Sequence, residues 1–158
     1  MNLKNFYIKY REYILFNKNI LISGLVAFFG GAAFAQLYYA VDEGNLSNSL
    51  VTLFVEYCIY IPLFGILFYF DNKKKYKDLY SGKNDYRKII SDIKKLVAAF
   101  SISEIIFSIS KVAIHYQLLQ MSLVEPYQAS MIGSIAAWII FLVIINTSIK
   151  AVKLFRSK

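Results

Sequence analysis

Apolar residues along this chain gather in four long windows separated by polar segments. The windows cover approximately residues 19–40, 49–70, 97–119 and 127–149. A helix of roughly 20 apolar residues is long enough to cross the hydrocarbon core of a bilayer. The pattern therefore predicts an all-α protein, a bundle of four transmembrane helices that forms a single membrane domain over residues 1–158.

The polar segments between the windows differ in charge. All of the 18 Lys and Arg except Lys111 lie before the first window, in the segment 71–96, or after the fourth window. The two other connections, "VDEGNLSN" and "MSLVEP", contain acidic residues but no Lys or Arg. Since basic residues mark cytoplasmic segments, we expect a multi-pass protein of the cell membrane with both termini and a basic loop, 71–96, in the cytoplasm. Basic residues beside spans bind anionic headgroups, so the net charge of +8 does not predict a nucleic-acid partner.

The two acidic connections are short, which predicts that the four helices form two antiparallel hairpins. Before the first window, "NLKNFYIKYREYILF" predicts an amphipathic segment that lies in the headgroup layer or simply extends the first span. Its apolar and aromatic residues at helical spacing are Leu3, Phe6, Tyr10, Tyr13 and Ile14.

Small residues dominate the first window, which reads "SGLVAFFGGAAFA" in its central part. Gly24, Gly31 and Ala35 recur at helical intervals on one side. Such residues let a second helix approach closely, so we expect this side to be a packing face.

One polar stripe runs along the third window. It consists of Ser101, Glu104, Ser108, Lys111 and His115. At 100° per residue these side chains fall on one side of a helix whose other sides are apolar. A charge near the bilayer centre costs about 2.5–3.5 kcal/mol on insertion scales, so the stripe should face the bundle interior and find partners there.

Counting about 1.5 Å per residue from the acidic connections gives the depth of each polar side chain. Lys111 and Glu56 come out about 12 and about 10 Å deep, which predicts an ion pair between them. Gln36 and His115 both come out about 6 Å deep, which predicts a hydrogen bond.

Glu104 lies deeper, and the count gives it no basic partner. A buried carboxyl group in that position is a candidate proton or cation site. The alternative is a structural role, in which serine and tyrosine hydroxyl groups hold the carboxyl group, with those of Tyr57 and Tyr60 available. For the whole stripe, a ligand or ion path and a structural polar core are the two interpretations.

The chain offers little for catalysis. One His, one Lys and two Glu in this arrangement do not have the spacing of a metal site, and the single cysteine, Cys58, cannot form a disulfide within the chain. No serine has a convincing base beside it in the pattern. We therefore expect neither an enzyme nor a bound metal or cofactor.

The order of segments resembles the GtrA-like family of small four-span membrane proteins. The resemblance covers most of residues 17–156: a basic start, a small-residue first span, a short outer loop, a second span ending in a cluster of Asn, basic and aromatic residues, and a repetition of that plan. The two clusters are "FYFDNKKKY" and "INTSIKAVKLF". Glu104, Lys111 and His115 depart from that plan.

The resemblance implies a role in moving or assembling polyprenyl-phosphate-linked sugars for cell-surface glycans. In that role Lys111 and His115 would meet an anionic headgroup, and Lys73, Lys74 and Lys75 would contact lipid headgroups at the inner face. The leading hypothesis is thus a membrane protein that assists translocation or assembly of a polar or anionic substrate, in particular a polyprenyl-phosphate-linked sugar, along the stripe.

Two other functions stay open. In the first, the protein is a non-catalytic accessory subunit whose stripe is a docking face in a membrane enzyme complex. In the second, it is a small proton-coupled exporter built around Glu104. Membrane lipids are expected partners in every case, and four helices are few for a complete transporter, which predicts a homo-oligomer or a larger complex.

Overall fold

A computed structural model describes residues 3–42, 44–77, 84–122 and 124–155, with side chains described at Tyr7 and from Tyr10 onward. These residues form four helices: α1 (Leu3–Tyr39), α2 (Asn45–Asn72), α3 (Tyr86–Met121) and α4 (Pro126–Ala151). Within the described ranges there is no strand, only an isolated bridge between Lys77 and Asn84. All four helices are long and apolar enough to cross a membrane, which confirms the predicted all-α class and its four apolar helices.

The helices are longer than the apolar windows, because the polar residues that flank a window can continue the same helix. α3 begins at Tyr86, within the basic segment 71–96 that precedes the third apolar window. Asp85 caps it, because its carboxylate accepts hydrogen bonds from the backbone N–H groups of Arg87 and Lys88. The ammonium group of Lys88, 3.1 Å from that carboxylate, together with these N–H groups, holds the pKa of Asp85 below its usual range.

Local signals also fix the turn between α3 and α4. Ser122 adopts a left-handed conformation with φ 51° and ends α3. Pro126 then begins α4, and Glu125 and Gln128 cap its first turn reciprocally. The short connection therefore reverses the chain with its helix ends satisfied.

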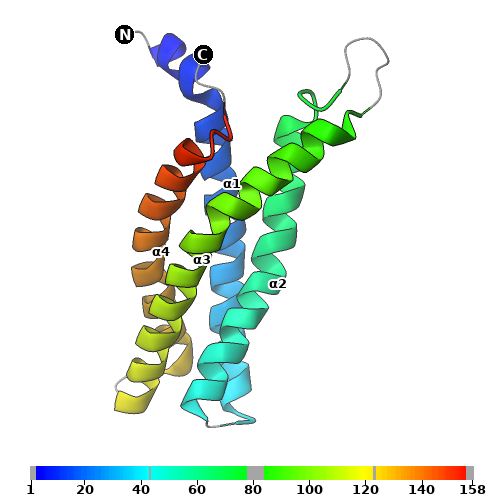
Figure 1. Ribbon diagram of the computed structural model, residues 1–158. Helices are drawn as coiled ribbons and strands as arrows, with labels where there is room; N and C mark the ends of the chain where they lie inside the picture. The colour runs from blue at the N-terminus through cyan, green and yellow to red at the C-terminus, as the bar shows by residue number, and fades with distance from the viewer. Residues whose placement is uncertain (1–2, 43, 78–83, 123, 156–158) are drawn as a thin grey trace.

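The amphipathic N-terminal segment is part of α1 and not a separate helix on the membrane surface. α1 runs without a break from Leu3 to Tyr39, and its first turns extend beyond the end of α4 (Figure 1). Tyr7 and Tyr10 are exposed, whereas Tyr13 packs against Phe155 with ring centroids 5.0 Å apart. Leu3 and Phe6, which belong to the predicted apolar side, have side chains outside the described residues.

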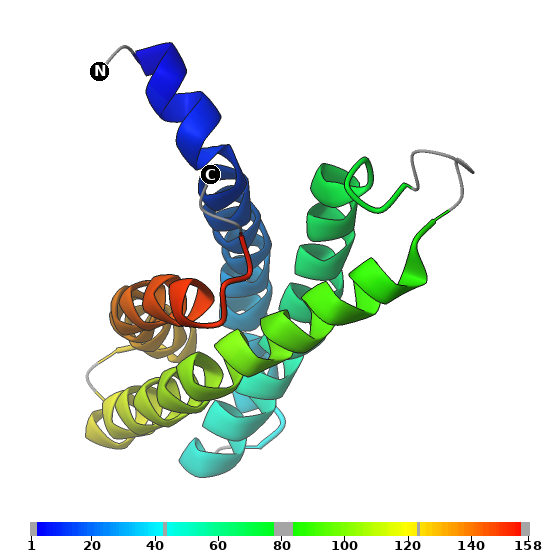
Figure 2. The ribbon, with the colours of Figure 1, turned by 45° about the horizontal axis from the view of Figure 1, so that its top comes forward.

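The helices are arranged as a ring in which each packs against its neighbours in the sequence and α4 closes onto α1. The most extensive contacts are those of α1 with α2 and of α3 with α4. α3 lies obliquely, so its first half passes α2 and its second half runs along α4 (Figure 2). Both chain ends and the segment between α2 and α3 lie at one end of the ring, called here the terminal end, and the two short connections lie at the other, the connection end (Figure 1).

Aromatic side chains fill the ring near the terminal end. Phe16 is almost fully buried, and its ring centroid lies 5.7–6.5 Å from those of four other rings. The five members of this phenylalanine cluster are Phe16, Phe64, Phe68, Phe100 and Phe155. Nearby, Asn17 and Asn146 exchange two amide hydrogen bonds of 2.9 and 2.8 Å that join α1 to α4.

Candidate functional site

Lys111, the only basic residue within the predicted spans, lies in the core of the bundle. Its side chain is completely buried and forms an ion pair with Glu56 of α2. Its Nζ also donates a hydrogen bond of 2.7 Å to Ser134 Oγ on α4, and Ser134 Oγ donates to Glu56 Oε1 at 3.3 Å. The predicted ion pair is confirmed, and it links three helices.

Glycines on α1 make room for this group. A Cβ atom at Gly31 would overlap the carboxyl group of Glu56, and one at Gly24 would overlap the ring of Trp138. Both glycines are buried, as is Ala35. The predicted packing face of α1 is thus confirmed, and its small residues admit functional groups from α2 and α4.

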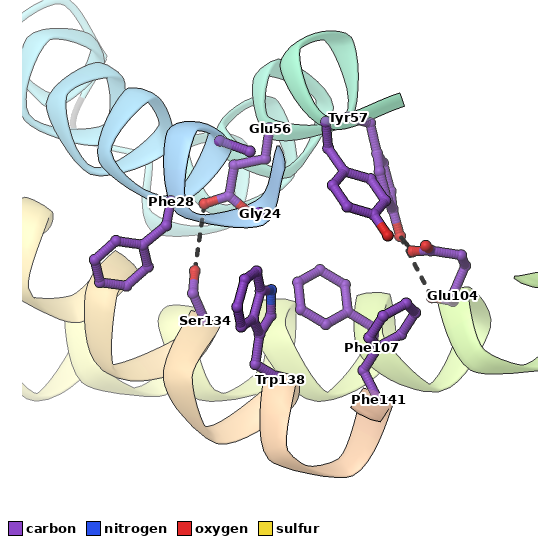
Figure 3. A pocket seen from close by; sticks show the side chains of 11 residues that line it. Gly24, Phe28, Glu56, Tyr57, Glu104, Phe107, Ser134, Trp138 and Phe141 are labelled. Atoms are coloured by element: carbon purple, nitrogen blue, oxygen red, sulfur yellow. Dashed lines mark hydrogen bonds between the residues drawn. The ribbon is translucent and has the colours of Figure 1, made fainter. Parts of the chain in front are cut away.

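Glu104 lies apart from this ion pair, toward the terminal end of α3. The hydroxyl group of Tyr57 on α2 donates to Glu104 Oε2 at 2.8 Å (Figure 3). Ser108 Oγ lies 2.6 Å from the same hydroxyl and donates to the carbonyl oxygen of Glu104 at 2.7 Å. Among the described residues no Lys, Arg or His pairs with Glu104, as the depth count predicted.

One pocket connects the two carboxyl groups. Glu56 and Glu104 both line it, together with Tyr57, Tyr60 and Ser134. Its other walls are Gly24 and Ala27 and the aromatic rings of Phe28, Phe107, Trp138 and Phe141 (Figure 3). The free space for the centres of water-sized molecules is about 20 Å³, which is room for roughly one or two waters.

The hydroxyl group of Tyr60 adds an unpaired donor to this pocket. Tyr60 is 9% exposed, and its hydroxyl oxygen is buried without a hydrogen-bond partner in the described part of the chain. Buried hydroxyl groups are normally paired. The sequence interpretation that placed both Tyr57 and Tyr60 on Glu104 is therefore correct for Tyr57 only.

The predicted hydrogen bond between Gln36 and His115 is wrong. Gln36 is exposed, and its Oε1 accepts a hydrogen bond from the backbone N–H of Tyr127 at 3.4 Å. His115 is completely buried, and neither of its ring nitrogens has a partner among the described residues.

The buried side of α3 is rotated relative to the predicted stripe. Ser103, Phe107, Lys111 and His115 are buried at intervals of four residues, whereas Glu104 and Ser108 are half-buried beside them and Ser101 is exposed. The stripe thus reaches the interior at its Lys111 end and only borders it at its Glu104 end.

Lys73, Lys74 and Lys75 follow α2 and are all exposed. Each of them has different neighbours. Lys75 forms an ion pair of 2.7 Å with Asp92, and Lys73 Nζ lies 5.4 Å from the ring centroid of Phe70. Lys74 lines a polar hollow that Arg11 and Asp71 also border. Contact of these lysines with lipid headgroups stays a prediction.

Ser134 was not predicted as part of the site. The signal in the sequence was the spacing of small residues on α4, where Ser130, Ser134 and Ala137 follow one another at intervals of four and three residues and are all buried. A stripe of small residues normally indicates helix packing, so the pattern alone did not distinguish a bridging hydroxyl group from a packing contact.

The fold and the site define an all-helical protein whose four described helices can each cross a membrane. One carboxyl group, that of Glu56, lies in the bundle interior, a second, that of Glu104, lies at its border, and both line one pocket. Comparison of the chain with family models, with curated proteins and with solved structures gives no match. The resemblance to the GtrA-like family stays a prediction.

Proposed function

We propose that this protein is a small proton-coupled carrier that moves a solute through the membrane, with Glu104 as its proton-binding or cation-binding group. The observation that supports this most is the imbalance of charge around the pocket. Two carboxyl groups line it, and the one ammonium group near it among the described residues, that of Lys111, is paired with Glu56.

Glu104 has the properties that such a site requires. Its carboxyl group has no basic partner among the described residues, and hydroxyl groups hold it in place. Ionised groups within a bilayer are costly unless paired, so this carboxyl group favours binding a proton or a cation. The proton and the cation would compete for the carboxyl group of Glu104. This competition would couple movement of the cation to movement of the proton.

The orientation of the carrier follows from the positions of its basic residues. Both chain ends and the segment between α2 and α3 lie at the terminal end (Figure 1), where nearly all Lys and Arg of the chain are found. By the positive-inside rule the terminal end faces the cytoplasm of a cell, and the chain forms two antiparallel hairpins, α1 with α2 and α3 with α4. The phenylalanine cluster then lies between the pocket and the cytoplasm.

Translocation of a lipid-linked sugar, the role implied by the family resemblance, is a weaker proposal. It requires basic side chains within the bundle that can meet a phosphate group. Lys111 is neutralised by Glu56, and both Lys111 and His115 are completely buried. The acidic pocket favours a cation over a phosphate.

Proteoliposomes loaded with a pH-sensitive dye test the proposal. We expect an imposed solute gradient to change the internal pH for at least one cation from a panel of guanidinium, tetramethylammonium and methylammonium. Glucose and glycerol phosphate should have no effect. Glu104→Gln should abolish the response, because an amide group binds neither a proton nor a cation in this way.

Glu12→Gln is the matched control, since Glu12 is exposed and lies outside the pocket. A pH change no larger than that of empty vesicles for every cation would overturn the carrier proposal, as would an unaltered response of Glu104→Gln. Absence of transport together with co-purification of a membrane enzyme that Lys111→Ala disrupts would support the accessory-subunit alternative.

A further inference from the structure

The pocket that all four helices line has the dimensions and the chemical groups of a binding site for one small ion. Its free space of about 20 Å³ accommodates an object of roughly the size of a water molecule. Tyr60 lines the pocket, and its hydroxyl group is buried and unpaired in the described part of the chain. A buried hydroxyl group without a partner, in the same pocket as a carboxyl group without a basic partner, indicates that a polar ligand completes both.

Charge restricts the ligand to a monovalent cation. When both carboxyl groups are ionised, Lys111 neutralises Glu56 and leaves one negative charge, that of Glu104. One bound positive charge then makes the site neutral, as burial in a bilayer favours. A divalent cation would leave an excess of positive charge, and an anion would add to the negative charge.

The walls of the pocket distinguish between monovalent cations. Five oxygen-bearing side chains line the pocket, but Glu56 and Ser134 are engaged with Lys111, and Tyr57 is engaged with Glu104 and Ser108. The carboxylate of Glu104 and the hydroxyl group of Tyr60 are therefore the oxygens left for a ligand, and the other walls are Gly24, Ala27 and aromatic rings. A metal ion within this pocket would lack the shell of oxygen ligands that replaces its hydration. An ammonium group instead donates hydrogen bonds to a few oxygens and directs its remaining positive surface toward aromatic faces.

We propose that the pocket binds ammonium or a primary alkylammonium ion such as methylammonium, with Glu104 and Tyr60 as its hydrogen-bond acceptors and with Trp138 and Phe107 against its other side. The assignment rests on the proposed function, because it names the solute class of the same pocket. The step is binding without covalent change: the cation replaces the proton on Glu104, and that proton leaves to water.

The single tryptophan of the chain is a built-in reporter, since Trp138 lines the pocket. The protein in detergent is titrated with ammonium, methylammonium, sodium, potassium and tetraethylammonium chlorides at constant ionic strength while Trp138 emission is measured. We expect a saturable change with ammonium and methylammonium, and no saturable change with the other three cations.

Two variants locate the binding. Glu104→Gln should weaken binding by about a hundredfold or more. Tyr60→Phe should raise the apparent Kd about tenfold, which is the effect of losing one hydrogen bond to a charged group; the hydroxyl group it removes has no partner in the described chain, so the fold should tolerate the change. Tyr86→Phe is the control, because Tyr86 is 71% exposed at the start of α3.

Each result decides the proposal. No saturable change with ammonium or methylammonium would overturn it, and so would equal responses to sodium or potassium, or equal Kd values for Tyr60→Phe and Tyr86→Phe. Binding and transport are separate measurements. Saturable ammonium binding without a pH response in vesicles would contradict the carrier alone, and a pH response with guanidinium in the absence of ammonium binding would contradict the ligand assignment alone.

Discussion

Removal of Lys111 is expected to destabilise this bundle strongly. Its side chain is completely buried, and its charge is compensated by Glu56 and by the hydroxyl group of Ser134. The attraction between two buried charges largely offsets their desolvation, but removing one partner leaves the other uncompensated. The stability of the bundle therefore requires that both charges are present or that both are absent.

A double-mutant cycle tests this requirement. We expect Lys111→Met to lower the free energy of unfolding by about 3–5 kcal/mol, and we expect Glu56→Gln in addition to recover part of that loss. Reversible unfolding in detergent measures all four proteins. Lys18→Met is the control: Lys18 also forms an ion pair, 2.8 Å from Asp71, but is 42% exposed, so its loss should cost less than about 1 kcal/mol. Equal costs for the two lysines would show that Lys111 is not buried against Glu56.

At the scale of the element, α1 acts as the surface against which the polar groups of other helices are placed. Its buried small residues let Glu56 and Trp138 approach the α1 backbone. Close van der Waals packing between helices is one of the main contributions to helix association in lipid. A larger residue on this face would therefore displace groups of the site and not only separate two helices.

Gly24→Ala and Gly65→Ala form a matched pair for this effect. A Cβ at Gly24 would overlap the ring of Trp138, whereas a Cβ at Gly65 has no neighbour within 4 Å among the described residues. We expect Gly24→Ala to lower the free energy of unfolding by about 1–3 kcal/mol and to shift the emission of Trp138. Gly65→Ala should leave both unchanged or stabilise the helix slightly. Identical behaviour of the two variants would mean that α1 and α4 are not in close contact at Gly24.

At the scale of the whole molecule, the two ends of the bundle differ in chemistry. The terminal end holds the phenylalanine cluster and most basic residues, whereas buried polar side chains occur toward both ends, among them Asn19 and Asp92 near the terminal end and His115 and Ser130 toward the connection end. The proposed carrier thus has an aromatic barrier on the cytoplasmic side of its pocket. Alternating access would require this cluster to open.

Cysteine labelling in intact cells tests the orientation. In a Cys58→Ser background, a membrane-impermeant maleimide should label Ser122→Cys, at the connection end, and should not label Lys77→Cys or Lys153→Cys until the cells are opened. Ser122, Lys77 and Lys153 lie outside the four helices, so labelling reports the side of the membrane. Labelling of Lys153→Cys in intact cells would reverse the orientation and place the phenylalanine cluster on the outside.

The depth of each polar residue in the bundle was predictable from the sequence, but the direction in which its side chain points was not. The depth count predicted the pair of Lys111 and Glu56 and the lack of a basic partner for Glu104. The same count placed Gln36 beside His115, which is wrong, since a count along the helix gives height and not rotation about the helix axis. Gln36 is on the outer side of α1, where Tyr127 is within reach.

The amino-acid sequence is enough to predict four helices that are long and apolar enough to cross a membrane, because uninterrupted apolar runs leave few alternatives for the backbone in lipid. It is also enough to predict that a lysine within such a run needs an acidic partner. The three-dimensional fold was needed to show that Ser134 bridges this pair, that Tyr57 and not Tyr60 holds Glu104, and that both carboxyl groups line one pocket. Those contacts depend on how the helices rotate and cross relative to one another, and the periodicity within one helix does not specify either.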